Sequence, residues 1–199
     1  MFNFCPSCAS SKITFSEGKV FRCPDCWFVY YHNNAAATGC LIVVPPPDGP
    51  EPSVGLHGRE RLVFTVRGKE PAAGKLDLPG GFVDHGEGIY EGLCRELKEE
   101  LGWTPPIPEG KCRDTALADV FRIFSSFHNV YHYKGINYNT CDMYFYVCAP
   151  GLTPEDFQLD KNEISEVRFL KHDEIDYDQF AFESTKKAVK AYYAAQVLP

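Results

Sequence analysis

The most constraining feature of this sequence is the stretch from Gly81 to Trp103, GFVDHGEGIYEGLCRELKEELGW. Apolar residues recur every four positions from Ile89 to Leu101, and this spacing predicts an amphipathic helix. Gly102 follows directly, and glycine is the residue that most often ends a helix. Further glycines precede the helix on both sides of Glu87. The stretch therefore predicts a glycine-rich loop followed by a helix that ends at Leu101.

Three glutamates lie on another face of the predicted helix. Glu96, Glu99 and Glu100 stand at positions i, i+3 and i+4, so their side chains converge. Most acidic runs on helices are solvated faces. The alternative is a site for Mg²⁺ or Mn²⁺, because hard cations prefer carboxylate oxygens. The preceding glycines favour this alternative, since they let the backbone approach a bulky anionic ligand.

The same stretch resembles the Nudix box, G-x5-E-x7-R-E-U-x-E-E-x-G-U, in which U is an aliphatic or aromatic residue. A chance match at so many constrained positions is rare. The constrained positions are filled, at the required spacing, by Gly81, Glu87, Arg95, Glu96, Leu97, Glu99, Glu100, Gly102 and Trp103.

The resemblance implies an α+β fold, the Nudix α/β/α sandwich with a mixed β-sheet. It also implies hydrolysis, with a divalent metal ion, of a diphosphate linked to a nucleoside. By the same resemblance Arg95 pairs with Glu87 and orients the metal-binding carboxylates. Strand order extends the resemblance loosely over residues 38–196. The implied ligands of Mg²⁺ or Mn²⁺ are Glu96, Glu99, Glu100 and the carbonyl group of Gly81.

Residues 1–34 form a separate predicted unit ahead of a Nudix domain over residues 35–199. Two CxxC pairs, Cys5 with Cys8 and Cys23 with Cys26, flank a predicted β-hairpin. Four thiolates brought together in this way form a tetrahedral site that selects Zn²⁺. A redox role fits less well, because it needs one such pair between a strand and a helix.

We interpret this unit as a zinc ribbon. Its metal would act as a structural staple, because some thirty residues bury little core of their own. A docking module for nucleic acid or a protein partner is the alternative. The few basic residues of the unit, Lys12, Lys19 and Arg22, form no basic patch, which favours the staple.

The rest of the chain predicts alternating strands and loops. We expect residues 30–34 to be a linker and residues 45–58 and 104–114 to be loops. The final helix is expected at residues 184–196. Strands are predicted at residues 40–44, 61–67, 120–124, 142–147 and 163–170.

The aromatic-rich segment at residues 125–139 is predicted to be a loop over the edge of the fold, because polar residues separate its aromatic ones. The aromatic rings either close the core or stack on a nucleobase. Phe127, Tyr131 and Tyr133 are the candidates for substrate binding. His128 and His132 lack a third metal ligand nearby and are expected to form local hydrogen bonds.

Two further candidate residues lie outside the box. Arg67, at a strand end, either contacts a phosphate or is a solvated charge. In Nudix enzymes a carboxylate from the loop region before the last strand often serves as general base or additional metal ligand. By this resemblance Glu163 is the first candidate and Glu166 the second. For both, the alternative is an exposed acid at the end of a strand.

Composition narrows the class of protein. A hydrophobic content of 44% supports a packed core, and the net charge of −7 argues against general affinity for nucleic acid. The sequence shows neither a signal peptide nor an apolar run long enough to span a membrane. Nine cysteines, an odd number without a disulfide framework, favour a reducing, cytoplasmic location. A homodimer is expected from the family resemblance.

A zinc ribbon followed by a Nudix domain is similar in architecture to NADH pyrophosphatases, which also act on NAD-capped RNA. That subfamily carries SQPWPFPxS after the box, whereas this chain reads SSFHNVYHY. The predicted partner is therefore a small nucleotide of the NADH, NAD or ADP-ribose type, with an oxidised nucleotide as the third option. The alternatives are a non-catalytic nucleotide-binding sensor and an RNA 5′-end (cap) processing factor whose ribbon binds RNA.

Overall fold

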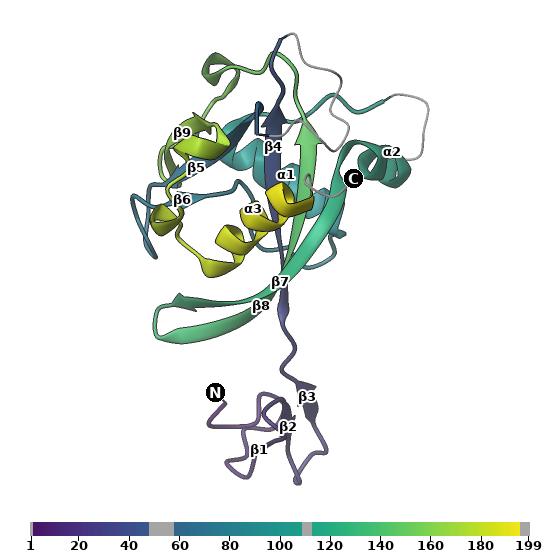
Figure 1. Ribbon diagram of the computed structural model, residues 1–199. Helices are drawn as coiled ribbons and strands as arrows, with labels where there is room; N and C mark the ends of the chain where they lie inside the picture. Colours follow the sequence, from purple (N-terminus) through teal and green to yellow (C-terminus); the bar gives the residue numbers. More distant parts are fainter. Residues whose placement is uncertain (1, 48–57, 109–112, 196–199) are drawn as a thin grey trace. The chain divides into compact units, whose positions relative to one another are not determined.

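The computed structural model describes residues 2–47, 58–108 and 113–195 (Figure 1). The chain divides into two compact units, Met1–Asn34 and Ala35–Pro199. Most of the loop predicted at residues 45–58, Cys112 and the last residue of the helix predicted at 184–196 lie outside the described residues. Within the described ranges, no helix has the length and apolar character needed to cross a membrane.

The first unit is a small antiparallel sheet of three strands: β1 (Thr14–Ser16), β2 (Val20–Arg22) and β3 (Val29–Tyr31). The predicted hairpin is present as β1 and β2. Its turn residues Glu17 and Gly18 both have positive φ, 55° and 69°, as the tightest hairpin turns require. The third strand occupies part of the segment expected to be a linker, and it pairs with β2.

The second unit is built on a six-stranded mixed sheet. Along the sheet the strand order is β6-β5-β4-β8-β7, and β9 also pairs with β5. The pair β4–β8 is parallel and the others are antiparallel. The strands are β4 (Ala35–Val44), β5 (Arg61–Arg67), β6 (Leu76–Asp77), β7 (Arg122–Tyr133), β8 (Ile136–Cys148) and β9 (Ile164–Leu170).

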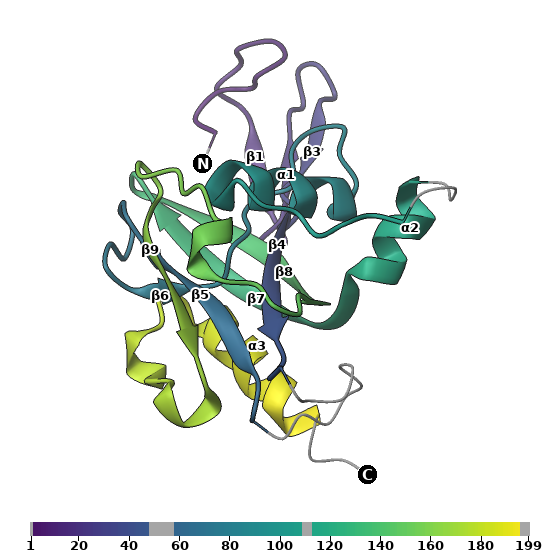
Figure 2. The ribbon, with the colours of Figure 1, turned by 90° about the horizontal axis from the view of Figure 1, so that it is seen from above.

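Three α-helices cover this sheet: α1 (Ile89–Leu101), α2 (Arg113–Val120) and α3 (Glu183–Ala195). Alternate residues of β4 belong to two different core clusters, one packed against α1 and α2 and the other against α3. Because successive strand residues point to opposite faces, the helices lie on both sides of the sheet (Figure 2). The expected α/β/α sandwich with a mixed sheet is confirmed. Three short 3₁₀ helices complete the unit: η1 (Pro154–Asp156), η2 (His172–Glu174) and η3 (Tyr177–Gln179).

The prediction of a loop at residues 125–139 is wrong. Strands β7 and β8 form one long hairpin through this region. Its two-residue turn, Lys134 and Gly135, has φ of 48° and 77°, which matches the right-handed twist of the flanking strands. Three of the polar residues that suggested a loop, Ser126, His128 and His132, occupy exposed positions of β7, whereas Ser125 and Asn129 are half-buried. The strand predicted at 120–124 is also displaced, because Val120 ends α2 and β7 begins at Arg122.

The predicted helix of the box is present as α1. Leu93, Leu97 and Leu101 are fully buried in the core. Gly102 ends the helix with φ of 63° and donates its N–H to the Lys98 carbonyl at 3.0 Å. A methyl group on Gly102 would lie 2.7 Å from Cβ of Gln158. Glycine is therefore required there by both conformation and space.

We predict that Gly102→Ala destabilises the protein more than Gly74→Ala does. Gly74 has a similar φ of 79° but no atom within 4 Å of the added methyl group, so its substitution isolates the conformational cost of about 1–2 kcal/mol. At Gly102 the contact with Gln158 should at least about double that loss of free energy of unfolding. Urea denaturation followed by circular dichroism measures both variants, and equal losses would contradict the steric argument.

Candidate active site

The segment just before the box lies against β4. The N–H of Thr38 donates to the carbonyl of Gly81 at 2.8 Å. A methyl group on Gly80 would lie 2.2 Å from the Thr38 oxygen, and one on Gly81 would lie 2.6 Å from Oε1 of Glu96. Only glycine fits at position 80, against the backbone of β4, whereas a side chain at position 81 would displace the carboxylate of Glu96. The Gly81 carbonyl retains a second lone pair.

Arg95 forms hydrogen bonds with several residues of the box. Its Nε and Nη2 donate to the two oxygens of Glu87 at 2.8 and 3.0 Å. Its Nη1 donates to Glu96 at 2.9 Å and to Glu99 at 3.0 Å, while Nη2 also reaches the Phe82 carbonyl at 3.0 Å. The bidentate hydrogen bond from Arg95 lowers the pKa of Glu87. One guanidinium group therefore connects the loop to two glutamates of α1.

The three box glutamates differ in exposure. Glu100 is buried, with 8% of its surface exposed, and its Oε2 accepts the N–H of Gly80 at 2.9 Å. Burial raises the pKa of Glu100 well above its usual value, and burial also raises the pKa of Glu96 against the opposing effect of Arg95. The side chain of Glu99 is 61% exposed.

This donor set fits a hard divalent cation. Two partly or fully buried carboxylates that resist ionisation would gain most from a nearby positive charge, and carboxylate and carbonyl oxygens are the ligands that Mg²⁺ and Mn²⁺ prefer. The ligand atoms of Glu96, Glu99 and Glu100 are not drawn together within 4.8 Å of one another; of the described residues, only four cysteines form such a group.

A cavity of about 240 Å³ lies over the carboxylates of Glu96 and Glu100. Glu163 lies at its wall, 39% exposed, in an ion pair with Lys69. The second candidate for general base, Glu166, pairs instead with Arg168 and does not line the cavity.

The four residues proposed from the sequence to bind substrate are placed differently. Arg67 lines the cavity, but its guanidinium group pairs with Asp77 at 3.1 Å and donates to the Pro71 carbonyl at 2.7 Å. Tyr131 also lines the cavity. Phe127 packs against Tyr144 in the core. Tyr133 stacks beside Tyr131, with ring centroids 6.2 Å apart, and does not line the cavity.

The sequence analysis missed several residues of the cavity wall. Lys69, Asp77 and Asp142 all line it. Asp142 carried one usable signal, because it is an acidic residue within a predicted apolar strand and alternates with Thr140 and Tyr144 on one face. Lys69 and Asp77 carried no signal in the sequence, because they contact Glu163 and Thr185, which are distant along the chain.

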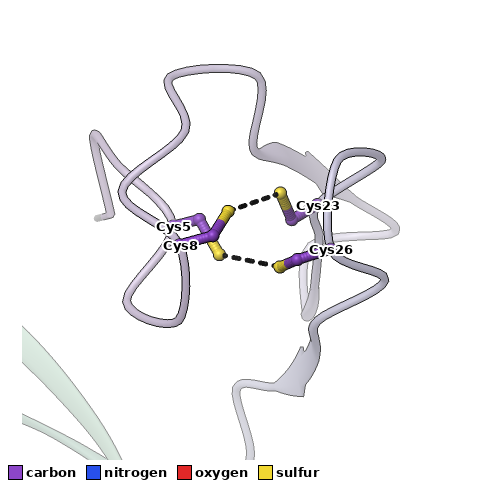
Figure 3. A group of neighbouring side chains, drawn as sticks. All are labelled: Cys5, Cys8, Cys23 and Cys26. Atoms are coloured by element: carbon purple, nitrogen blue, oxygen red, sulfur yellow. Dashed lines mark hydrogen bonds between the residues drawn. The ribbon is translucent and has the colours of Figure 1, made fainter.

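In the first unit the four CxxC cysteines meet (Figure 3). The sulfur atoms of Cys5 and Cys26 lie 3.6 Å apart and those of Cys8 and Cys23 lie 3.7 Å apart. These distances are too long for disulfides, which measure about 2.05 Å. All four sulfur atoms lie within 4.8 Å of one another. The arrangement is compatible with a zinc ribbon.

Both cysteine pairs form the same backbone turn. The N–H of Ala9 donates to the Cys5 carbonyl at 2.8 Å, and the N–H of Trp27 donates to the Cys23 carbonyl at 3.0 Å. Ala9 and Trp27 also share the left-handed conformation, with φ of 60° and 61°. Two equivalent knuckles thus present their thiols to one point, as a tetrahedral sulfur site requires.

Comparison with known proteins decides the family. Residues 53–192, well over half of the chain, match the family model of the NUDIX domain. The chain belongs to the Nudix family. The Nudix hydrolases are a pyrophosphatase family that acts on acid anhydrides, and the box described above is the signature of the Nudix family.

Two curated relatives match this chain over short stretches. The chain is 37% identical over 60 residues to an ADP-ribose pyrophosphatase of Methanocaldococcus jannaschii, covering 28% of this chain and 36% of that protein. It is 48% identical over 54 residues to the U8 snoRNA-decapping enzyme of Bos taurus, covering 27% of each. The chain thus spans about a third or less of the length of these curated relatives.

Solved structures share the fold. A NUDIX hydrolase from Nitrosomonas europaea superposes with a TM-score of 0.58 and 24% identity, covering 97% of this chain and 91% of that one. An Ap4A hydrolase of C. elegans superposes with a TM-score of 0.54 and 17% identity, covering 80% of this chain and 96% of that one. At these identities the likeness establishes the Nudix fold alone.

We predict that Glu100→Gln stabilises the protein at pH 7.5 in the absence of Mg²⁺ and Mn²⁺. Because burial raises the pKa of Glu100 in the folded state, the folded state binds more protons than the unfolded state, so stability falls as pH rises above the ordinary glutamate pKa of about 4.3. Glutamine cannot ionise, so the variant avoids this loss of stability at high pH, and its amide oxygen still accepts the Gly80 N–H. Each kcal/mol gained raises Tm by about 2–4 °C.

Thermal denaturation at pH 4.5 and 7.5 measures this effect. The gain in Tm from Glu100→Gln should be larger at pH 7.5, where the carboxyl group is forced to ionise. Glu99→Gln is the matched control, since the Glu99 side chain is largely exposed. A lower Tm for Glu100→Gln at pH 7.5 would show that burial does not disfavour the charged form.

Proposed function

We propose that this protein is a Mg²⁺- or Mn²⁺-dependent hydrolase that cleaves the diphosphate linkage of nucleoside diphosphate derivatives of the NADH, NAD or ADP-ribose type. The products are a nucleoside monophosphate and a second phosphorylated fragment. The observation that carries the proposal is the pair of carboxylates that line the cavity, half-buried Glu96 and buried Glu100. Arg95 holds Glu96, and the Gly80 N–H holds Glu100. Such a costly group of acids is explained by a cationic ligand.

The cation would be held by Glu96, Glu99, Glu100 and the Gly81 carbonyl. When bound, it supplies activation of water and stabilisation of negative charge on the diphosphate. Arg95 keeps the carboxylates oriented through hydrogen bonds to Glu96 and Glu99. The pairing of Arg95 with Glu87 fixes the guanidinium group itself, so the loop and the helix move as one element.

Glu163 is the proposed general base. The oxygen of water attacks one phosphorus atom, the bridging P–O bond breaks, and the water proton passes to the Glu163 carboxylate. Its position at the cavity wall supports this role, and Lys69 holds the carboxylate in place by an ion pair. Glu166 is disfavoured because it lies outside the cavity.

Two considerations support the substrate class. The matched stretch of the Methanocaldococcus jannaschii relative belongs to a protein named ADP-ribose pyrophosphatase. The ribbon ahead of the Nudix domain is similar in architecture to NADH pyrophosphatases. A non-catalytic sensor is disfavoured because the box keeps each of its glutamates. The proposed setting is cytoplasmic, and the proposed assembly is a homodimer.

RNA 5′-end processing is the second candidate function. It is favoured by the 48% identity, over 54 residues, to a U8 snoRNA-decapping enzyme. The ribbon adds exposed aromatic side chains, among them Trp27 at 85% exposure, and exposed aromatics stack on unpaired bases. The acidic net charge counts against it, so we rank this function below hydrolysis of a small nucleotide.

We predict that a hydrolysis panel with Mg²⁺ or Mn²⁺ gives its highest kcat/KM with NADH, NAD or ADP-ribose. The panel also holds diadenosine polyphosphates, oxidised nucleoside triphosphates and NAD-capped RNA. Glu99→Gln and Glu100→Gln should each lower kcat at least about a hundredfold while the fold is retained, because each removes a proposed metal ligand.

Glu155→Gln is the control for this panel, because Glu155 is an exposed acid on η1, away from the cavity. Full activity in both box variants would overturn the assignment of the metal site. Preference for capped RNA, with a steep dependence on salt, would favour the second candidate function.

We also predict one Zn²⁺ per chain, bound by Cys5, Cys8, Cys23 and Cys26. Cys23→Ser should release the zinc and unfold the first unit, because the small sheet has little core of its own. Mg²⁺-dependent hydrolysis should remain within about threefold of the original rate if the metal is a staple. Metal analysis by mass spectrometry checks the stoichiometry, with Cys141→Ser as the control, an exposed cysteine outside the cluster.

A further inference from the structure

The cavity has a second group of polar side chains, away from the box in sequence. Asp142 of β8 lines the cavity and is 8% exposed. Its Oδ2 accepts hydrogen bonds from Ser184 Oγ at 2.7 Å and from the Tyr144 hydroxyl at 3.5 Å. Its other oxygen, Oδ1, has no hydrogen-bond donor among the residues that the structure describes. Oδ1 is not one of the fully enclosed side-chain atoms that lack a partner, so this acceptor is accessible to a ligand in the cavity.

Asp142 is held in place by a connected network. The Tyr144 hydroxyl lies 3.4 Å from Thr185 Oγ1. Thr185 donates in turn to Asp77 at 2.9 Å, and Asp77 pairs with Arg67. This network fixes the direction of the Asp142 carboxylate before any ligand arrives, which is what a selective hydrogen-bond acceptor needs.

A second unsatisfied group lies in the same cavity wall. Thr38 of β4 is 6% exposed, and its Oγ1 has no hydrogen-bond partner. Residue 37, its neighbour in β4, stands opposite Asp142 in the parallel pair with β8. Because paired residues of neighbouring strands share a face, Thr38 and Asp142 point to opposite faces of the sheet, and the unsatisfied Thr38 hydroxyl is a feature separate from Asp142.

Charge determines which part of a ligand can approach Asp142. A negative phosphate would be repelled by a buried carboxylate. The diphosphate therefore belongs at the box, where the proposed dication offsets its charge. Tyr131 and Phe182, whose ring centroids are 5.6 Å apart, also line the cavity, and such rings stack against a planar base. The neutral nucleoside end of the ligand fits the part of the cavity that contains Asp142.

We propose that Asp142 determines specificity by accepting a hydrogen bond from a neutral N–H or O–H donor on the nucleoside end of the substrate. This contact orients the diphosphate toward Glu96 and Glu100. The donor is either the exocyclic amino group of the base or a ribose hydroxyl. The inference rests on the proposed function, because it assumes an adenosine phosphate as one half of the substrate.

The test is equilibrium binding of AMP in Mg²⁺, measured by isothermal titration calorimetry. Three analogues each lack one donor: the 5′-monophosphates of purine riboside, 2′-deoxyadenosine and 3′-deoxyadenosine. We expect at least one analogue to bind about ten- to a hundredfold more weakly than AMP, the usual effect of losing a hydrogen bond to a charged acceptor. The analogue affected identifies the donor.

Asp142→Asn keeps the shape of the side chain and allows an amide oxygen to accept from Ser184. It should bind AMP and the affected analogue with affinities within about twofold of each other, because the open acceptor has become a donor. Asp142→Ala is the second variant, and its Tm is measured to show that it folds. Asp178→Asn is the matched control, since the Asp178 side chain is exposed and lies outside the cavity.

The inference is overturned if all three analogues bind like AMP, if the deficit persists in Asp142→Asn, or if AMP does not bind. Hydrolysis of ADP-ribose by the unmodified protein is measured in parallel. If ADP-ribose is hydrolysed but AMP binding does not depend on Asp142, the inference is wrong and the proposed function stands. Donor-selective AMP binding that depends on Asp142, without hydrolysis of any panel compound, would uphold the inference and sink the proposed reaction.

Discussion

The site depends on one guanidinium group. Arg95 is bonded to both oxygens of Glu87, to Glu96, to Glu99 and to the Phe82 carbonyl. Without this positive charge, like-charged carboxylates on neighbouring turns of α1 would repel each other and turn outward. The planar fork of arginine suits this role, because a lysine could not form the bidentate contact with Glu87 while also reaching two other acids. The acidic face of the helix is therefore positioned before any cation binds.

The sheet supplies the other half of the site. Strand β4 is buried on both faces, and its edge near Thr38 carries the glycine segment that supports Glu96 and Glu100. Strand β8 runs parallel to β4 and places Asp142 on the same cavity. The acids proposed to hold a cation and the acid proposed to recognise a neutral group thus line one cavity, on different elements. Their separation can give a diphosphate ligand a defined direction of binding.

The sequence predicted the features that depend on residues close together in the chain. The helix of the box, the strand from Arg61 to Arg67 and the convergence of four cysteines were all predictable, since spacing alone specifies them. The polar group around Asp142 was not, because β6, β8 and α3 meet only in the folded chain. The hairpin of β7 and β8 was missed for another reason: polar residues between the aromatic ones suggested a loop, and the turn at Lys134 and Gly135 was not recognised.

Those polar residues have a consequence for solubility. Strand β7 is the last in its sheet, so one side of its backbone has no strand partner in the described part of the chain and could serve as a template for another chain. Its exposed positions include Ser126, His128 and His132, and the two histidines bond to asparagines of β8. A register shift near Ser125 further bends the strand. The polar residues and the register shift oppose such pairing, although Ile123, Val130 and Tyr133 are exposed on the same strand.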